Sequence, residues 1–121
     1  MSDIALFLKS DLGQRMGEAH QRGELFREKP FMMGVSAKEL KPSFPESETV
    51  LIQGIIDAWF IEDGEIVLLD YKTDRVKSEK ELTDRYRVQL ELYSRALTSY
   101  TEKKVKEVYI YSFTLGKVIL L

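Results

Sequence analysis

The spacing of hydrophobic residues changes along the first fifty positions of the chain. Apolar side chains recur every four residues at the start, which predicts a helix over 3–22. We expect Gly23 to end this helix. Residues 24–35 read as an extended stretch, and Pro30 favours an edge strand because proline has no N–H for a second neighbour. Residues 36–49, rich in Pro, Ser, Glu and Lys, predict a loop. The apolar residues of the helix are Ile4, Phe7, Leu8, Leu12 and Met16.

The clearest pattern is a pair of apolar runs joined by a short polar turn. Residues 50–61 form one run and residues 65–72 form the other. Between them, Asp63-Gly64 is a dipeptide that favours a two-residue hairpin turn, because both residue types tolerate a positive φ. These features predict a central β-hairpin.

The rest of the chain predicts one helix followed by two strands. After a polar stretch at 73–84, residues 85–100 predict a helix with one inward face. Residues 105–113 and 117–121 predict strands. The helix is then a crossover between the hairpin and the first of these strands, so the chain is predicted to be a mixed α/β domain. The inward face of the helix carries Tyr86, Gln89, Leu90, Tyr93, Leu97 and Tyr100.

Composition limits the classes of protein to consider. The 121 residues suit one compact domain, and 44% hydrophobic with 31% charged residues is typical of globular proteins. The lack of cysteine excludes disulfides, iron–sulfur clusters and zinc–thiolate sites, and it agrees with a reducing, cytoplasmic location. No apolar run approaches the roughly 20 residues of a membrane span, so we expect no membrane partner. The single histidine, His20, excludes a two-histidine metal motif within this chain.

The net charge of -2 excludes a strongly basic nucleic-acid module, but it hides an asymmetry. Residues 1–70 carry a net charge of -6 and residues 71–106 a net charge of +4. A carboxylate cluster beside a cationic surface suits a metal-dependent enzyme that acts on a polyanion. Charges scattered over a solvated surface give the same totals, and the totals alone favour that simpler interpretation.

The turn sets the register of the hairpin. With Asp63 and Gly64 as the two loop residues, Asp57 lies directly opposite Asp70. Like charges in opposite positions destabilise a sheet, and carboxylates among Ile, Leu, Val, Ala and Trp are costly unless something compensates them. A divalent cation bound by oxygen ligands would do so.

Lys72 lies two residues beyond Asp70 and therefore on the same face of the strand. This arrangement suits phosphodiester hydrolysis, in which a metal neutralises the phosphate and activates a water. The lysine would orient or help to deprotonate that water, or stabilise the developing charge. The alternative is a structural ion pair, which is the preferred interpretation for an isolated Asp-x-Lys tripeptide. Gly54 leaves room for a close approach of backbone or ligand near Asp57.

Gln89 and Tyr93 are spaced by four residues and share one face of the predicted helix. An amide and a phenol in these places would bind a phosphate backbone or steady the metal cluster. Packing is the alternative, with Tyr93 in the core and Gln89 at its boundary, and spacing alone favours packing.

Three segments together resemble the RecB-like nucleases of the PD-(D/E)xK superfamily. They are residues 54–57 (GIID), 70–75 (DYKTDR) and 89–93 (QLELY), in the order and spacing of that family. Residues 26–31 (FREKPF) are similar to the strand that precedes the hairpin there. Within the superfamily, the chain is most similar to the C-terminal nuclease domain of the AddA (RexA) subunit of bacterial ATP-dependent helicase–nucleases.

The resemblance implies a restriction-endonuclease-like core, a mixed sheet flanked by helices. It implies that Asp57, Asp70 and the carbonyl of Tyr71 bind Mg²⁺, with Mn²⁺ as a substitute, and that Lys72 is the catalytic lysine. Gln89 and Tyr93 would be the supporting pair. The enzymes of this family process double-strand DNA ends for recombinational repair in the cytoplasm, at the nucleoid, with a second subunit of the AddB (RexB) type.

The chain departs from the family pattern in two respects. It has no phosphate-binding loop of the G-x-x-x-x-G-K-[ST] type, so it lacks the helicase motor and resembles a C-terminal fragment of a longer chain. Family members also supply a histidine ligand from a G-T-x-x-H helix, whereas His20 lies in another context and is expected to face solvent. Glu28 is expected to form an edge salt bridge, although it would also be able to approach the metal. The isolated fragment would then bind metal weakly and cleave poorly.

Two other classes of function remain open at this point. One is a non-catalytic module that uses the same fold to hold DNA or another polypeptide of the complex, and the other is a purely structural domain. The presence of Asp57, Asp70 and Lys72 together favours the enzyme. Four basic residues, Arg75, Lys77, Arg85 and Arg87, would track a DNA backbone or simply belong to a solvated loop.

Overall fold

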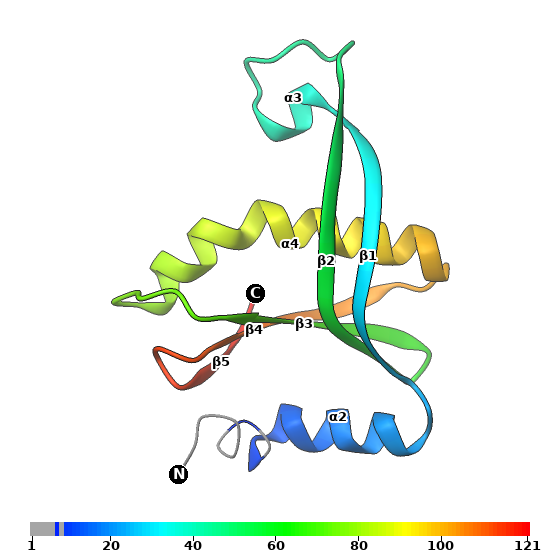
Figure 1. Cartoon of the computed structure of the whole chain (residues 1–121), viewed down its shortest axis with the longest axis vertical. Helices are drawn as coiled ribbons and strands as arrows, with labels where there is room; N and C mark the ends of the chain where they lie inside the picture. The colour runs from blue at the N-terminus through cyan, green and yellow to red at the C-terminus, as the bar shows by residue number, and fades with distance from the viewer. Residues whose placement is uncertain (1–6, 8) are drawn as a thin grey trace.

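The computed structural model of the chain describes residue 7 and residues 9–121, so residues 3–6 and Leu8 of the first predicted helix lie outside the described residues. The described part is a five-stranded sheet with α2 on one side and α4 on the other (Figure 1). None of the described helices is long and apolar enough to cross a membrane. The elements in chain order are α2 (Asp11–Gln21), β1 (Leu25–Ser36), α3 (Ala37–Leu40), β2 (Thr49–Glu62), β3 (Glu65–Lys72), α4 (Glu79–Thr101), β4 (Val105–Ser112) and β5 (Lys117–Leu120).

The sheet is mixed, as the order of predicted elements requires. Its strands follow the order β1-β2-β3-β4-β5. All neighbours are antiparallel except β3 and β4, which are parallel and are joined by α4 as the crossover. Strand β1 is an edge strand, and Pro30 pairs with Ile55 within it, as predicted from the missing N–H. The mixed α/β class and the crossover helix are therefore confirmed.

Alternate residues of the central strand, β3, pack into two separate hydrophobic cores. Ile66 and Leu68 of β3 face α4, whereas Val67 and Leu69 face α2. The α4 side is completed mainly by Ile56, Trp59, Leu82, Leu90, Tyr93, Leu97 and Ile110. The α2 side is completed by Phe7, Leu12, Met16, Ala19, Ala58, Phe60 and Tyr111. Both faces of β3 are thus buried, which explains its continuous apolar run.

The central hairpin has the predicted turn. Asp63 and Gly64 have φ values of 55° and 77°, the left-handed conformation at both positions of a type I′ turn. Glu62 pairs with Glu65, and the pairing continues to Ala58 opposite Leu69. The register predicted from the turn is confirmed over these residues.

The first predicted helix is not continuous up to Gly23. Ser10 interrupts it with an extended backbone (ψ 160°), and its hydroxyl accepts a hydrogen bond from the Gly13 N–H at 3.0 Å, so it caps a separate helix, α2. Apolar periodicity continues across Ser10 and therefore concealed this break. Gly23 ends α2 as predicted, with a φ of 74°.

The helix predicted at 85–100 begins six residues earlier, at Glu79, and ends at Thr101. Ser78 caps its N-terminus by accepting a hydrogen bond from the Glu81 N–H at 3.2 Å. The capping residue lies in the polar stretch at 73–84, so the hydrophobic pattern alone missed the first turns. The inward face is as predicted except for Tyr100, which is 64% exposed and lies beside the edge strand β1, with Lys29 Nζ 4.0 Å from the centre of its ring.

The predicted loop at 36–49 contains one short helix, α3. The Ala37 N–H donates to the Glu48 carbonyl at 2.8 Å, and Arg95 of α4 forms an ion pair with Glu39 at 3.3 Å. These contacts lie at the far end of β1 and β2, which extend well beyond the other strands (Figure 1). The two strands therefore part from β3 part-way along their length.

Candidate active site

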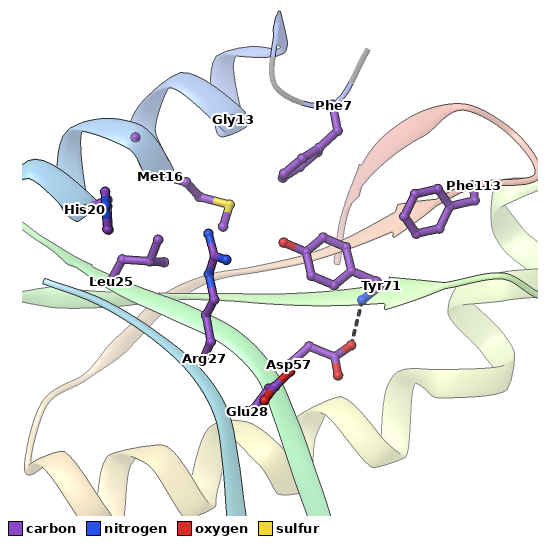
Figure 2. Close-up of a pocket in the computed structure, with 11 residues that line it drawn as sticks. Phe7, Gly13, Met16, His20, Leu25, Arg27, Glu28, Asp57, Tyr71 and Phe113 are labelled. Carbon is purple, nitrogen blue, oxygen red and sulfur yellow. Dashed lines mark hydrogen bonds between the residues drawn. The ribbon is translucent and has the colours of Figure 1, made fainter. Parts of the chain in front are cut away.

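Strand β2 separates from β3 at Asp57, and this separation creates the candidate site. Main-chain pairing between the strands ends at Ala58 and Leu69. At the next position, the Asp57 carboxylate accepts a hydrogen bond from the Tyr71 N–H at 3.0 Å, so a side chain takes over from the main chain of β2 (Figure 2). We call this place, formed by Asp57, Asp70 and the main chain of Tyr71, the fork.

The pairing of β2 with β1 is also interrupted at the fork. Arg27 pairs with Ala58 and Lys29 with Ile56, but the rung of Glu28 and Asp57 between them is missing. Glu28 has a φ of 51°, a strained conformation for a residue with a side chain. The ladder is therefore irregular on both sides of Asp57, and its carboxylate is free to turn towards β3.

Asp70 lies on the α4 side of the fork and is only 3% exposed. Its pKa is raised to about 6, first by burial and then by the nearby Asp57 carboxylate, while Lys72 opposes both effects. The Lys72 Nζ lies 2.8 Å from Asp70 Oδ2, yet that oxygen receives no well-directed hydrogen bond from the described residues. The two carboxylates therefore share one site with less positive charge than they need.

Lys72 is held from the helix side. Its ammonium lies 3.9 Å from the centre of the Tyr86 ring and 3.4 Å from Gln89 Oε1. The Gln89 amide donates to the Tyr93 hydroxyl at 3.2 Å, and Tyr93 is itself buried. The two interpretations of the Gln89 and Tyr93 pair are therefore compatible, since Tyr93 packs in the core while Gln89 connects it to Lys72.

The sequence did not reveal that Tyr86 supports Lys72 or that Asp74 holds Tyr86 in place. The Tyr86 hydroxyl donates to Asp74 Oδ2 at 2.8 Å, and Arg85 forms an ion pair with the same carboxylate at 2.7 Å. These contacts orient the Tyr86 ring against Lys72. The available signal was the spacing of three between Tyr86 and Gln89 on one helix face.

Gly54 makes room for side chains and not, as expected, for backbone or a ligand. A methyl group at this position would lie 2.9 Å from Phe31 Cε1 and 3.0 Å from the Tyr93 hydroxyl. The Phe31 and Tyr93 rings also meet edge to face at 5.0 Å. Gly54 therefore allows α4 to place Tyr93 and Gln89 close to β2.

The donors at the fork are suitable for a hard divalent cation. Within one strand residue the N–H and C=O point to the same side, so the Tyr71 carbonyl lies on the Asp57 side, while the Lys72 carbonyl accepts from the Phe113 N–H at 3.0 Å. Two carboxylates and this carbonyl are oxygen ligands of the kind that Mg²⁺ takes together with water. The described residues contain no group of three or more His, Cys, Asp or Glu side chains that would hold a metal.

The remaining candidates lie outside this cluster. His20 is exposed on α2, as expected. Glu28 forms no ion pair with any described residue, so the expected edge salt bridge is wrong; it leaves the β1–β2 ladder with a φ of 51° and lines the same pocket as Asp57. Among the basic residues at 73–87, Arg85 is committed to Asp74 and Glu81, and the others are exposed: Arg75, Lys77 and Arg87.

Comparison with known proteins agrees with this geometry. A family described as the PD-(D/E)XK nuclease superfamily matches residues 6–117. The chain belongs to this superfamily. The resemblance found in residues 54–57, 70–75 and 89–93 is therefore confirmed for this nuclease domain at the level of the family.

Two curated relatives extend the comparison, and both are the A subunit of an ATP-dependent helicase/nuclease. The chain is 49% identical over 121 residues to the protein from Syntrophomonas wolfei, a match that covers 98% of this chain and 10% of the relative. It is 45% identical over 122 residues to the protein of the same name from Clostridium botulinum, with the same coverage. This nuclease domain therefore spans about a tenth of the length of the curated relatives it matches.

A solved structure supports the fold. The crystal structure of SSO0001 aligns with 99% of this chain and 48% of its own, with a TM-score of 0.52 and 14% sequence identity. At this identity the likeness concerns the fold alone, a mixed sheet flanked by helices.

Proposed function

We propose that this chain is a Mg²⁺-dependent deoxyribonuclease domain, the exonuclease part of an ATP-dependent helicase–nuclease that processes double-strand DNA ends for recombinational repair. Its partners would be DNA and a second subunit of the AddB (RexB) type, in the cytoplasm at the nucleoid. The membership of the PD-(D/E)XK superfamily and the helicase/nuclease relatives support this proposal. We infer that the chain is the C-terminal part of such a polypeptide.

The observation that carries the proposal is the meeting of Asp57, Asp70 and Lys72 at the fork. Asp70 is buried, its pKa is raised to about 6 by burial and by Asp57, and Lys72 Nζ lies 2.8 Å away. Two carboxylates that meet at a buried position repel each other and lower the stability of the fold, which supports a functional role for Asp57 and Asp70. A bound cation would remove that repulsion.

In this mechanism each residue has a separate task. Asp57, Asp70 and the Tyr71 carbonyl would hold Mg²⁺, which supplies charge neutralisation of the phosphate and an activated water. Lys72 would orient that water and stabilise the negative charge that develops on the phosphate. Gln89 and Tyr86 keep the ammonium of Lys72 in place, with Nζ 3.4 Å from Gln89 Oε1 and 3.9 Å from the Tyr86 ring centre. Tyr93 orients Gln89 in turn.

The test is the substitution Asp70→Asn in the complete gene product. Asparagine keeps the shape of the side chain but removes the charge that holds the cation. Because loss of even an outer partner of a metal site costs about 10–100-fold, we expect cleavage of labelled linear DNA in Mg²⁺ to fall by more than about 100-fold.

The matched control is Asp84→Asn, which removes an exposed carboxylate on α4 that pairs with Lys80. This variant should cleave like the wild type. Wild-type cleavage by Asp70→Asn, with the control behaving normally, would contradict the proposed nuclease site and would favour a module that holds DNA or a partner without cutting it.

For the 121-residue chain by itself we expect weak metal binding and slow cleavage, because the described side chains supply only two carboxylate ligands at the fork. Titration with Mn²⁺, followed by electron paramagnetic resonance, measures this binding directly. Asp57→Asn should weaken it, and equal binding by both chains would exclude the fork as the metal site.

A further inference from the structure

A cleft of about 600 Å³ lies between α2 and the sheet, on the face opposite α4 (Figure 2). Its helix wall includes Gly13, Gly17 and His20, and its sheet wall includes Arg27, Asp57 and Tyr71. A methyl group on Gly17 would have no neighbour within 4 Å among the described residues, so this wall is not tightly packed. The cleft ends at a residue of the fork, Asp57.

The cleft gives the direction from which a substrate reaches the fork. On the α4 side, Asp70 is 3% exposed and the Lys72 side chain 16% exposed, because α4 packs over them. On the α2 side, Asp57 lines an open cleft, so this side offers a DNA strand a route to the fork.

Arg27 is the positively charged residue that a DNA strand would meet in the cleft. It pairs with Ala58, the neighbour of Asp57, and its guanidinium rises from β1 towards α2 and the Tyr71 hydroxyl (Figure 2). Burial raises the pKa of Tyr71, and the positive charge of Arg27 opposes that rise, so the two groups are within electrostatic reach. Arg27 lines the cleft and is exposed to solvent, so its guanidinium is accessible to a DNA strand that enters there.

Arg27 has no partner that explains its place in the cleft. Four arginines form ion pairs, namely Arg15, Arg22, Arg85 and Arg95, whereas Arg75 and Arg87 form none with the described residues and do not line the cleft. Arg27 forms no hydrogen bond or ion pair with any described residue, and the carboxylate of Asp57 accepts from the Tyr71 N–H instead. A guanidinium with five free donors suits the two oxygens of a phosphate.

We propose that Arg27 binds a backbone phosphate of the DNA strand in this cleft and so holds the scissile phosphodiester against the fork. This inference rests on the proposed nuclease function, and it adds a substrate-binding residue and a direction of approach. Arg27 and Lys72 would then act from opposite faces of the sheet, the first on the incoming strand and the second on the reacting phosphate.

The test compares Arg27→Ala, Arg27→Lys and the control Arg95→Ala in the complete gene product. The substrate is a short single-stranded oligonucleotide, cleaved in Mg²⁺ without ATP. Because a hydrogen bond to a charged group contributes about 1.5–3 kcal/mol, we expect kcat/KM to fall by about 10–100-fold in Arg27→Ala, mainly through KM. Arg27→Lys should recover part of the loss because it keeps the charge, and Arg95→Ala should behave like the wild type.

A binding measurement separates a phosphate contact from a structural role. Anisotropy of the labelled oligonucleotide in EDTA, over a range of salt, should give a slope of log Kd against log salt that is lower by roughly 0.7 in Arg27→Ala. An unchanged slope would overturn the inference, whether Arg27→Ala cleaves normally or loses cleavage together with thermal stability.

The inference and the proposed function fail in different ways. If Asp70→Asn abolishes cleavage but Arg27→Ala keeps the wild-type slope and KM, only the role of Arg27 is wrong. If Asp70→Asn cleaves normally, the nuclease site is wrong, and a reduced slope in Arg27→Ala would still place DNA in the cleft.

Discussion

The two ends of the β2–β3 pair carry carboxylates in opposite circumstances. At the turn end, Glu62 accepts hydrogen bonds from Arg15 at 2.7 Å and from Lys106 at 2.9 Å, and Arg15 also pairs with Glu107. The Arg15 hydrogen bond lowers the pKa of Glu62 to about 2. At the fork, burial and a second carboxylate raise the pKa of Asp70 to about 6.

This difference separates charges that serve the fold from charges that serve a reaction. At the turn end Glu62 and Glu107 each have a cation, and removal of either partner of such a pair costs stability. At the fork, Lys72 is the only cation in contact with the two carboxylates among the described residues, so the fold is less stable than it would be with neutral groups. The predictions below test this contrast, from the largest expected effect to the smallest.

Lys72→Ala should have the largest effect. Loss of a group that orients the water and stabilises charge lowers a rate by about 10²–10⁴-fold, so DNA cleavage by the complete gene product should fall by that factor. The matched change at the turn end is Lys106→Ala, which removes the positive charge that pairs with Glu62. Lys106→Ala should leave the cleavage rate unchanged. Equal losses of cleavage in the two variants would contradict a catalytic role for Lys72.

Neutral replacements should change stability in opposite directions at the two ends. Asp70→Asn removes a buried like-charge contact, so the free energy of unfolding of the metal-free chain should rise by about 1–3 kcal/mol. Glu62→Gln removes two ion pairs and should lower it by about 1 kcal/mol. Urea unfolding in EDTA at neutral pH measures both, and a decrease for Asp70→Asn would contradict the contrast.

Gly54→Ala should show that the fork depends on close packing. The added methyl group would press on Phe31 and on the Tyr93 hydroxyl, so we expect a loss of about 1–3 kcal/mol in stability together with slower cleavage. Gly17→Ala is the control for the same chemical change in open space within α2. It should stabilise the chain by about 0.5–1 kcal/mol, and thermal melting of both variants checks the difference.

The smallest expected effect is the acid sensitivity of the turn end. The pKa of Glu62 is about 2 in the fold and 4.5 in its ordinary state, so its ion pairs stabilise the fold fully above pH 4.5. That contribution is lost as pH falls from 4.5 towards 2, by at most about 1 kcal/mol because the pair is partly exposed. Melting temperatures over this pH range should fall less steeply for Glu62→Gln than for the wild type. Parallel curves would exclude this role of Glu62.

Local sequence signals predicted the parts of the fold that local physics controls. The Asp63-Gly64 turn, the register of the hairpin and the edge position of Pro30 each follow from backbone preferences of one or two residues. The start of α4 at Ser78 and the break at Ser10 were missed, because side-chain capping decided them and the hydrophobic pattern did not show it.

The candidate site divides in the same way. Spacing predicts Asp57 opposite Asp70, but main-chain pairing ends one rung earlier, at Ala58 and Leu69. Spacing also predicts Lys72 on the same face as Asp70, and the ion pair at 2.8 Å agrees with that. No spacing connects Tyr86 with Lys72, or Arg27 with the cleft, because these contacts join elements that are distant along the chain. They depend on how α4 and α2 pack on the two faces of the sheet.

The sequence by itself therefore determined the hairpin, its turn and its register as far as Ala58 and Leu69. Only the tertiary structure decided that β2 leaves β3 at Asp57 and that α4 buries Asp70 and Lys72 while α2 leaves a cleft. The physical reason is that register depends on neighbouring residues, whereas burial, and with it the pKa of Asp70, depends on every layer packed against the sheet.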